Sequence, residues 1–149
     1  MTDILTQLES AIATQLAPLK SYGLDVLNSP HRCGGGARAV ALFYFTDETA
    51  QGSNNGCSST NELTLKVEVQ ACDQRSHHIA YPYIQAVKIS LKNFAPGIGG
   101  ADRFKYVSTR YLPFEDKNGM KWLYDMTFTL QLMECDVYDV PSAIADLFS

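Results

Sequence analysis

Two stretches of strict two-residue alternation constrain most what this chain can fold into. Residues 62 to 72 alternate apolar with charged or polar side chains, and in residues 121 to 133 every second residue is large and apolar. Successive side chains of a strand point to opposite faces, so both stretches predict strands with one face in a core. The apolar series of the second stretch is Trp122, Tyr124, Met126, Phe128, Leu130 and Leu132.

A hairpin is predicted to contain the second of these strands. Residues Arg103 to Phe114 also have strand character, and EDKNGM separates them from the alternating stretch that begins at Lys121. Asn118-Gly119 favours a two-residue turn because both central positions of a type I′ turn need positive φ. The two stretches are therefore expected to pair as antiparallel neighbours.

Two further strands are expected in the first third of the chain. Residues Ala37 to Thr46 (ARAVALFYFT) form a nearly continuous apolar run, which is typical of a strand buried on both faces. We predict that this is a central strand of the sheet. A short strand is expected around Asp25 to Leu27.

Helical spacing appears in three places. Thr2 to Lys20 is expected to form about five turns, capped by Thr2 or Asp3 and ended by Gly23. Tyr81 to Phe94 follows the same pattern, with Pro82 in the tolerant first turn. Pro141 to Phe148 is expected to be a short final helix. The apolar positions of the first helix are Ile4, Leu5, Leu8, Ile12, Leu16 and Leu19.

These elements predict one α+β domain over residues 1–149. The chain has 149 residues, of which 46% are hydrophobic, and this length supports a single core. Strands and helices neither alternate strictly nor segregate, so we expect a mostly antiparallel sheet with helices packed on one face. Residues 134–149 are expected to form a C-terminal tail.

Residues Asp47 to Asn61 are expected to form an exposed loop. The segment DETAQGSNNGCSSTN is rich in Gly, Ser and Asn and holds no aliphatic or aromatic side chain other than Ala50. Long loops in compact domains are often functional, so this segment is a candidate contact site for a partner.

Charge and cysteine content exclude several classes of protein. The formal charge of −4 argues against nonspecific binding of nucleic acid or anionic lipid as the main activity. No apolar run approaches the roughly 18 residues of a membrane helix, and the N-terminus lacks signal-peptide features, so we expect a soluble cytoplasmic chain. Free thiols are expected at the widely spread cysteines rather than a disulfide framework. These are Cys33, Cys57, Cys72 and Cys135.

No motif predicts an enzyme, a metal or a cofactor. Gly34-Gly35-Gly36 lacks the Lys-Ser/Thr pair and the following helix of a phosphate loop. His77 and His78 lie near Cys72 and Asp73, but adjacent histidines point in different directions and no second ligand pair completes a tetrahedral site. No nucleophile motif is present, and the acidic pairs at 47–48 and 115–116 have the character of solvated surface. A spatially assembled triad stays open at this level.

The charge distribution is uneven along the chain. Basic residues gather between positions 102 and 121, whereas the last sixteen residues hold four acids and no base. Opposite charge on two flanks would favour head-to-tail contact between identical copies, although scattered surface charge explains the pattern equally well. The basic residues are Arg103, Lys105, Arg110, Lys117 and Lys121, and the acidic ones are Glu134, Asp136, Asp139 and Asp146.

The order and spacing of several segments resemble the tail terminator, or tail-completion, proteins of long-tailed bacteriophages, especially those of Mu-like contractile-tailed phages. The segments that carry the resemblance are ILTQLESAIATQL, YIQAVKISLKNF, FKYVSTRYLPF and KWLYDMTFTLQL. They are packing patterns rather than catalytic signatures, and they extend over nearly the whole chain. The long polar loop and the segment from Pro141 to Ser149 depart from the pattern.

The resemblance implies a noncatalytic virion protein at the tail–neck junction, assembled in the host cytoplasm. Such a protein forms a ring, usually hexameric, on the head-proximal end of the tail tube, where it stops polymerisation. Its partners would be the tube protein and a neck or connector protein, with the sheath protein as a further candidate partner. DNA would pass through without specific binding. No cofactor and no membrane are implied.

Two sets of contact residues are expected on this hypothesis. The subunit interface is expected to use Arg103, Lys105, Arg110, Glu134, Asp136 and Asp139. The contacts with tube or neck are expected in loops that contain Asp47, Glu48, Asn54, Asn55, Lys117 and Asn118.

Two other functions stay open at this level. One is another ring-forming connector, such as a head-closure or neck protein, which only binding to preformed tube ends would distinguish. The other is a small hydrolase or ligand-binding α+β domain that uses His77, His78 or Cys72.

Overall fold

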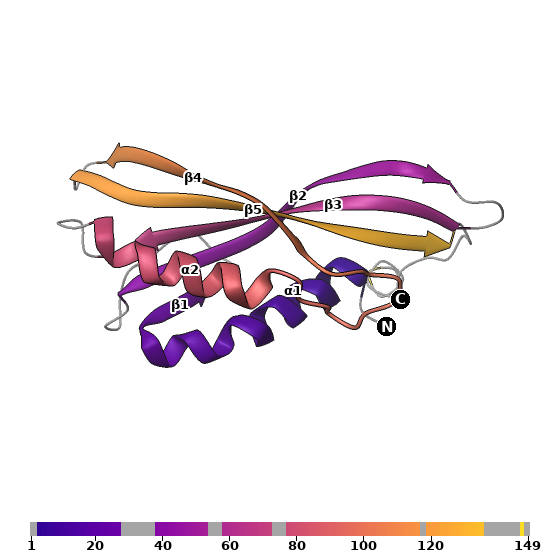
Figure 1. Ribbon diagram of the computed structural model, residues 1–149, viewed down its shortest axis with the longest axis horizontal. Helices are drawn as coiled ribbons and strands as arrows, with labels where there is room; N and C mark the ends of the chain where they lie inside the picture. Colours follow the sequence, from indigo (N-terminus) through magenta and orange to yellow (C-terminus); the bar gives the residue numbers. More distant parts are fainter. Residues whose placement is uncertain are drawn as a thin grey trace.

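The computed structural model describes residues 3–27, 38–53, 58–72, 77–116, 119–135 and 147. In this part of the chain, two α-helices lie on one face of a twisted five-stranded sheet (Figure 1). The architecture is the α+β fold that the sequence predicts, with helices on one face. In chain order the elements are α1 (Ile4–Leu16), η1 (Ala17–Tyr22), β1 (Leu24–Leu27), β2 (Ala39–Ser53), β3 (Ser58–Ala71), η2 (His77–Ile79), α2 (Ala80–Leu91), β4 (Lys105–Asp116) and β5 (Gly119–Cys135).

The strand order in the sheet is β1-β2-β3-β5-β4. Only β1 and β2 are parallel, and the other three pairs are antiparallel. The short strand expected near Asp25 is β1, and the predicted hairpin is β4 with β5, in which Asp116 pairs with Gly119. Lys117 and Asn118, at the predicted turn, lie outside the described residues.

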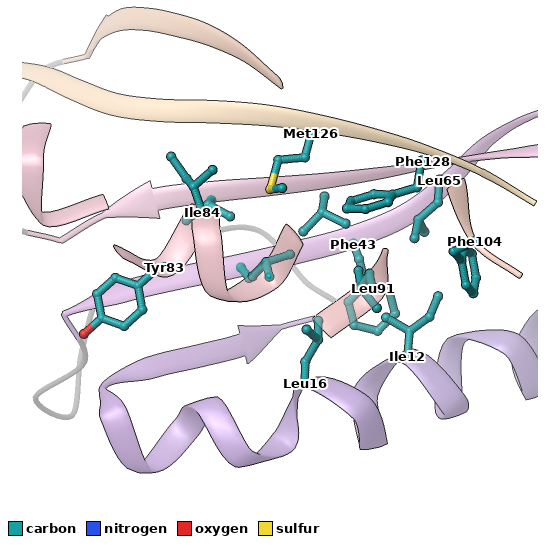
Figure 2. Close-up of a cluster of buried hydrophobic side chains, with 14 of the residues drawn as sticks. Ile12, Leu16, Phe43, Leu65, Tyr83, Ile84, Leu91, Phe104, Met126 and Phe128 are labelled. Atoms are coloured by element: carbon teal, nitrogen blue, oxygen red, sulfur yellow. The ribbon is translucent and has the colours of Figure 1, made fainter. Parts of the chain in front are cut away.

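The core lies between the sheet and the two α-helices. Figure 2 shows Phe43, Leu65 and Phe128 of the sheet facing Ile12 of α1 and Leu91 of α2. The alternation in β3 and β5 is confirmed, because the apolar series of each strand is buried except for Trp122, which is half-buried. These buried residues are Leu63, Leu65, Val67, Val69 and Ala71 in β3, and Tyr124, Met126, Phe128, Leu130 and Leu132 in β5.

The first helix is shorter than predicted. Asp3 caps it as expected, since its carboxylate accepts a hydrogen bond from the Thr6 backbone N–H at 2.9 Å. Pro18 has no N–H to donate to the Thr14 carbonyl, which instead accepts from Ala17. The chain therefore continues as the 3₁₀ helix η1 and ends at Gly23, whose φ of 99° fits the predicted glycine stop.

The prediction that residues 37–46 are buried on both faces is wrong in part. Ala39, Ala41 and Phe43 are buried toward the helices, but Leu42 and Tyr44 on the opposite face are only half-buried. None of the described helices lies on that face (Figure 1). The strand is interior where predicted, because Ala39–Leu42 pairs with both β1 and β3.

The expected loop at 47–61 is also wrong in part. Residues 47–53 complete β2 and residues 58–61 begin β3, and the two strands pair from Asp47↔Thr64 to Ser53↔Ser59. Backbone hydrogen bonds form this arm without an apolar face, so side-chain pattern gave no signal of it. Asp47 to Ala50 are exposed, as expected, and residues 54–57 lie outside the described residues.

The expectation of free thiols is wrong for Cys72, which is disulfide-bonded. No cysteine spacing marked this residue for pairing. Cys33, Cys57 and the side chain of Cys135 lie outside the described part, as do Gly34 to Gly36 and, apart from Leu147, the helix predicted at Pro141 to Phe148.

Candidate protein–protein interface

The residues considered for chemistry do not assemble into a centre in the described part of the chain. His78 is exposed and meets the edge of the Tyr81 ring, with centroids 5.4 Å apart, while Cys72 is held in a disulfide. Among the described residues no three His, Cys, Asp or Glu side chains are grouped to hold a metal. Asp73 and the side chain of His77 lie outside the described part. Surfaces are therefore the better candidates for function.

The first such surface is the free edge of β4, the last strand of the sheet. Lys105 pairs with Thr129 and Arg110 with Asp125, and no described strand lies on the other side of β4. The pairing shifts between Tyr106 and Ser108, so Val107 is an extra residue in the strand and is 53% exposed. An edge strand offers unpaired N–H and C=O groups to another chain.

The second surface is the edge of β2 on the opposite side of the sheet. Strand β1 covers only Ala39 to Leu42, so among the described strands residues 43–53 pair with β3 alone. Asp47 and Glu48 lie on this stretch. Figure 1 shows this end of β2 and β3, with the end of β5, extending past the helices on the right, away from the β4–β5 hairpin on the left.

The predicted charged residues lie along β4 and β5. The Arg103 guanidinium donates to the Asn93 carbonyl at 3.0 Å, and the neighbouring Asp102 N–H donates to Gln131 O at 2.9 Å. Glu134, which pairs with Ser59, lies three residues beyond Gln131 on β5. At strand spacing the Cα atoms of Gln131 and Glu134 are about 10 Å apart. The structure thus brings the Arg103 and Glu134 backbones to one end of the sheet. Asp136, Asp139, Asn54 and Asn55 lie outside the described residues.

The sheet face opposite the helices is polar. At its centre the Lys66 ammonium lies 2.7 Å from the Thr127 hydroxyl and 3.4 Å from Asp125 Oδ2, whereas the other Asp125 oxygen is buried without a described hydrogen-bond partner. Burial and the nearby Glu68 carboxylate raise the pKa of Tyr44 above its ordinary value. The described charged residues on this face are Asp47, Glu62, Glu68 and Asp125, with Lys66, Lys105 and Arg110.

A hollow of about 350 Å³ lies where α2 begins beneath β4 and β5. Its described lining residues are all aromatic, namely Tyr81, Tyr111, Trp122 and Tyr124. Sequence reasoning assigned Trp122 and Tyr124 to the core and missed the hollow. The structure sets Tyr111 opposite Tyr124, Pro113 opposite Trp122 and Asp116 opposite Gly119. A two-residue turn at Asn118-Gly119, as predicted, would instead have set Tyr111 opposite Met126, so the predicted register was wrong and the sequence held no signal of this group of rings.

Comparison with known proteins gives a likeness in structure. No protein-family model matches the chain, and no curated protein matches it. A chain in a solved structure described as the virion of a native gene transfer agent particle has a similar fold, with a TM-score of 0.55 and 14% sequence identity. The match covers 89% of this chain and 100% of that one. At this identity the likeness establishes a shared fold.

The described helices also bear on membrane association. None of them is both long enough and apolar enough to cross a membrane.

Proposed function

We propose that this protein is a structural, noncatalytic component of a phage-like virion that acts as a tail terminator. In this role it forms a ring on the head-proximal end of the tail tube, stops tube growth and presents a docking surface to a neck protein. The observation that carries the proposal is the fold shared, over the full length of the neighbour, with a chain of a gene transfer agent virion. The resemblance of the sequence to tail terminators supports the finer role.

The two sheet edges support ring formation. In a ring of identical copies, each copy contacts the next through one patch and the previous one through another. The two patches must therefore be different and complementary. The edges of β4 and of the outer part of β2 are different strands on opposite sides of one sheet. Pairing of the β4 edge with the β2 edge of the next copy would satisfy the backbone groups of both.

The polar sheet face supports passage of DNA. The described part of that face carries four carboxylates and three basic side chains among threonines and glutamines. An acidic lining does not neutralise phosphates, so DNA would slide past without releasing counterions and binding. In the proposed ring this face points to the channel, and the helices point outward.

The two ends of the sheet support contacts with different neighbours. The arm of β2 and β3 carries Asp47 and Glu48, and the β4–β5 hairpin occupies the opposite end (Figure 1). We assign one end to the tube and the other to the neck. The contacts predicted at Asn54, Asn55, Lys117 and Asn118 lie outside the described residues and stay predictions.

Growth of tail tubes in the presence of the purified protein tests this proposal. Tube subunits of the same particle are polymerised with and without the chain, and tube lengths are measured by electron microscopy. The expected result is shorter tubes, each with extra density at one end, at amounts of protein far below those of tube subunits. Tubes of unchanged length, together with binding of the chain to isolated portals, would instead identify a head-closure or neck protein.

A further inference from the structure

Two of the aromatic side chains that line the hollow are exposed to solvent, and neither the packing of the core nor the proposed ring requires this exposure. Tyr81, in the first turn of α2, is 46% exposed, and Tyr111, on β4, is 41% exposed. Tyr124 beneath them is buried, and Trp122 is half-buried. Exposed aromatic residues that gather at a concave surface mark sites of contact with other molecules.

The rings of the hollow support one another. Tyr111 stacks on Trp122 with centroids 5.5 Å apart and planes 28° from parallel, and it lies 5.2 Å from Tyr124. Tyr81 meets Tyr124 edge to face at 5.8 Å. Burial and the neighbouring phenols raise the pKa values of Tyr111 and Tyr124, so both stay uncharged at neutral pH. The hollow therefore offers neutral, electron-rich ring faces with fixed relative orientation.

We propose that this hollow binds the guanidinium group of an arginine side chain presented by a partner protein. A planar guanidinium stacks on aromatic faces and is attracted by the negative charge of the ring faces. None of the described lining residues carries a positive charge that would oppose it, and the protein as a whole has a net charge of −4. Arginine, tyrosine and tryptophan are also the residues that most often pair at the centres of protein interfaces.

We assign the arginine to a separate partner rather than to a second copy of this chain. Of the three described arginines, Arg103 already donates to a backbone carbonyl, and Arg110 adjoins Tyr111 on the same strand, on the opposite face of the sheet. Arg38, just before β2, is exposed and is the described arginine that a second copy would have to present. The site goes beyond the proposed ring and does not depend on it.

Trp122 is the only tryptophan of the chain, so its fluorescence reports directly on the hollow. The purified full-length protein is titrated with N-acetyl-arginine amide and, as a neutral analogue of the same shape, with N-acetyl-citrulline amide. The expected result is a saturable change with a dissociation constant on the order of millimolar for the arginine compound, and binding at least about fivefold weaker for citrulline. No saturable response, or equal responses to both compounds, overturns the proposal.

Two variants connect the response to the ring faces. Tyr111→Leu keeps an apolar side chain but removes the ring, so arginine binding should weaken about fivefold or more. Tyr22→Leu, at a tyrosine 74% exposed outside the hollow, should leave binding unchanged. Thermal unfolding followed by circular dichroism confirms that both variants are folded. Equal binding by the two folded variants would contradict the assignment.

A sedimentation measurement separates the two sources of arginine. If the occupant comes from a partner protein, saturating arginine amide leaves the oligomeric state of the chain unchanged. Dissociation of the chain's own oligomer by the arginine amide, and not by the citrulline amide, would identify a second copy as the occupant and overturn the proposal of a separate partner.

Discussion

Gly100 is the residue at which close backbone packing most strictly limits side-chain size. A Cβ atom there would lie 2.3 Å from the Met133 carbonyl oxygen and 3.1 Å from the Met133 Cβ. The close approach lets the Gly100 carbonyl accept from the Met133 N–H at 3.1 Å, and Ala101 bridges to Leu132 beside it. The segment before β4 is thereby fixed across the end of β5.

We predict that Gly100→Ala destabilises the protein by about 1 to 3 kcal/mol, because the added methyl group must displace backbone rather than a flexible side chain. Urea unfolding measures the change. Gly97→Asn is the matched control, since Gly97 has open space around it and its φ of 70° is one that asparagine tolerates. Equal stability of Gly100→Ala and the unmodified protein would show that the segment does not pack as described.

The two large aromatic residues of β5 should differ in their contribution to stability. Phe128 is fully buried, so Phe128→Ala is predicted to cost about 3 to 5 kcal/mol through the cavity it leaves. Trp122 lies on the same face of β5 as Phe128 but is half-buried at the hollow. Trp122→Ala should therefore lower the free energy of unfolding clearly less than Phe128→Ala. Chemical denaturation of both variants checks the order. A larger loss for Trp122→Ala would mean that the hollow is filled in solution.

At the scale of elements, side-chain periodicity predicted the strands and helices that bury an apolar face and missed the strand segments that have none. The alternation in β3 and β5 and the spacing in α2 reflect burial, so the sequence contained them, and Asn118-Gly119 marked the hairpin. The arm formed by residues 47–53 and 58–61 depends on backbone pairing between polar residues, which has no apolar signature. The disulfide at Cys72 depends on tertiary placement. The end of α1 at Leu16 depends on the missing N–H of Pro18.

The candidate interfaces were only partly accessible from sequence. Strand order decides which edges are free, and no residue pattern encodes that β1 pairs with Ala39 to Leu42 alone or that β4 is last among the described strands. The charges at Arg103 and Lys105 could be seen as a basic segment, but their place on an edge could not. The hollow required the register of β4 against β5 together with the position of Tyr81 on α2.

A substitution on the β4 edge tests the use of this element in self-association. We predict that Val107→Lys weakens self-association at least about tenfold, because a charged side chain on an edge opposes strand addition. Ile89→Lys is the control, at an exposed apolar residue of α2 that faces away from the sheet edge. Sedimentation equilibrium measures both. Equal effects of the two changes would indicate that β4 is not the interface.

At the scale of the whole molecule, one sheet provides separate surfaces for separate contacts. The helix-covered face holds the core, no described helix covers the polar face, and the two edges and two ends point in different directions. A protein built in this way can act through shape and contact alone. Each surface can then be changed without loss of the fold.

Charge reversal tests whether electrostatics contributes to assembly. We predict that the double variant Arg103→Glu and Lys105→Glu weakens self-association and makes it less sensitive to salt, because the attraction between basic and acidic segments is lost. The double variant Lys20→Glu and Lys92→Glu changes the net charge equally but in the helical layer. Sedimentation across a salt series compares them. An unchanged salt dependence for the first pair would remove electrostatic pairing from the account.

Native mass spectrometry of the purified chain tests the central claim most directly. The account predicts one closed assembly, with a mass near six times the 16.5 kDa of the chain, which is lost when the β4 edge is altered by Val107→Lys. A chain that stays monomeric at every concentration measured, or that forms a series of open oligomers without a preferred size, would contradict it.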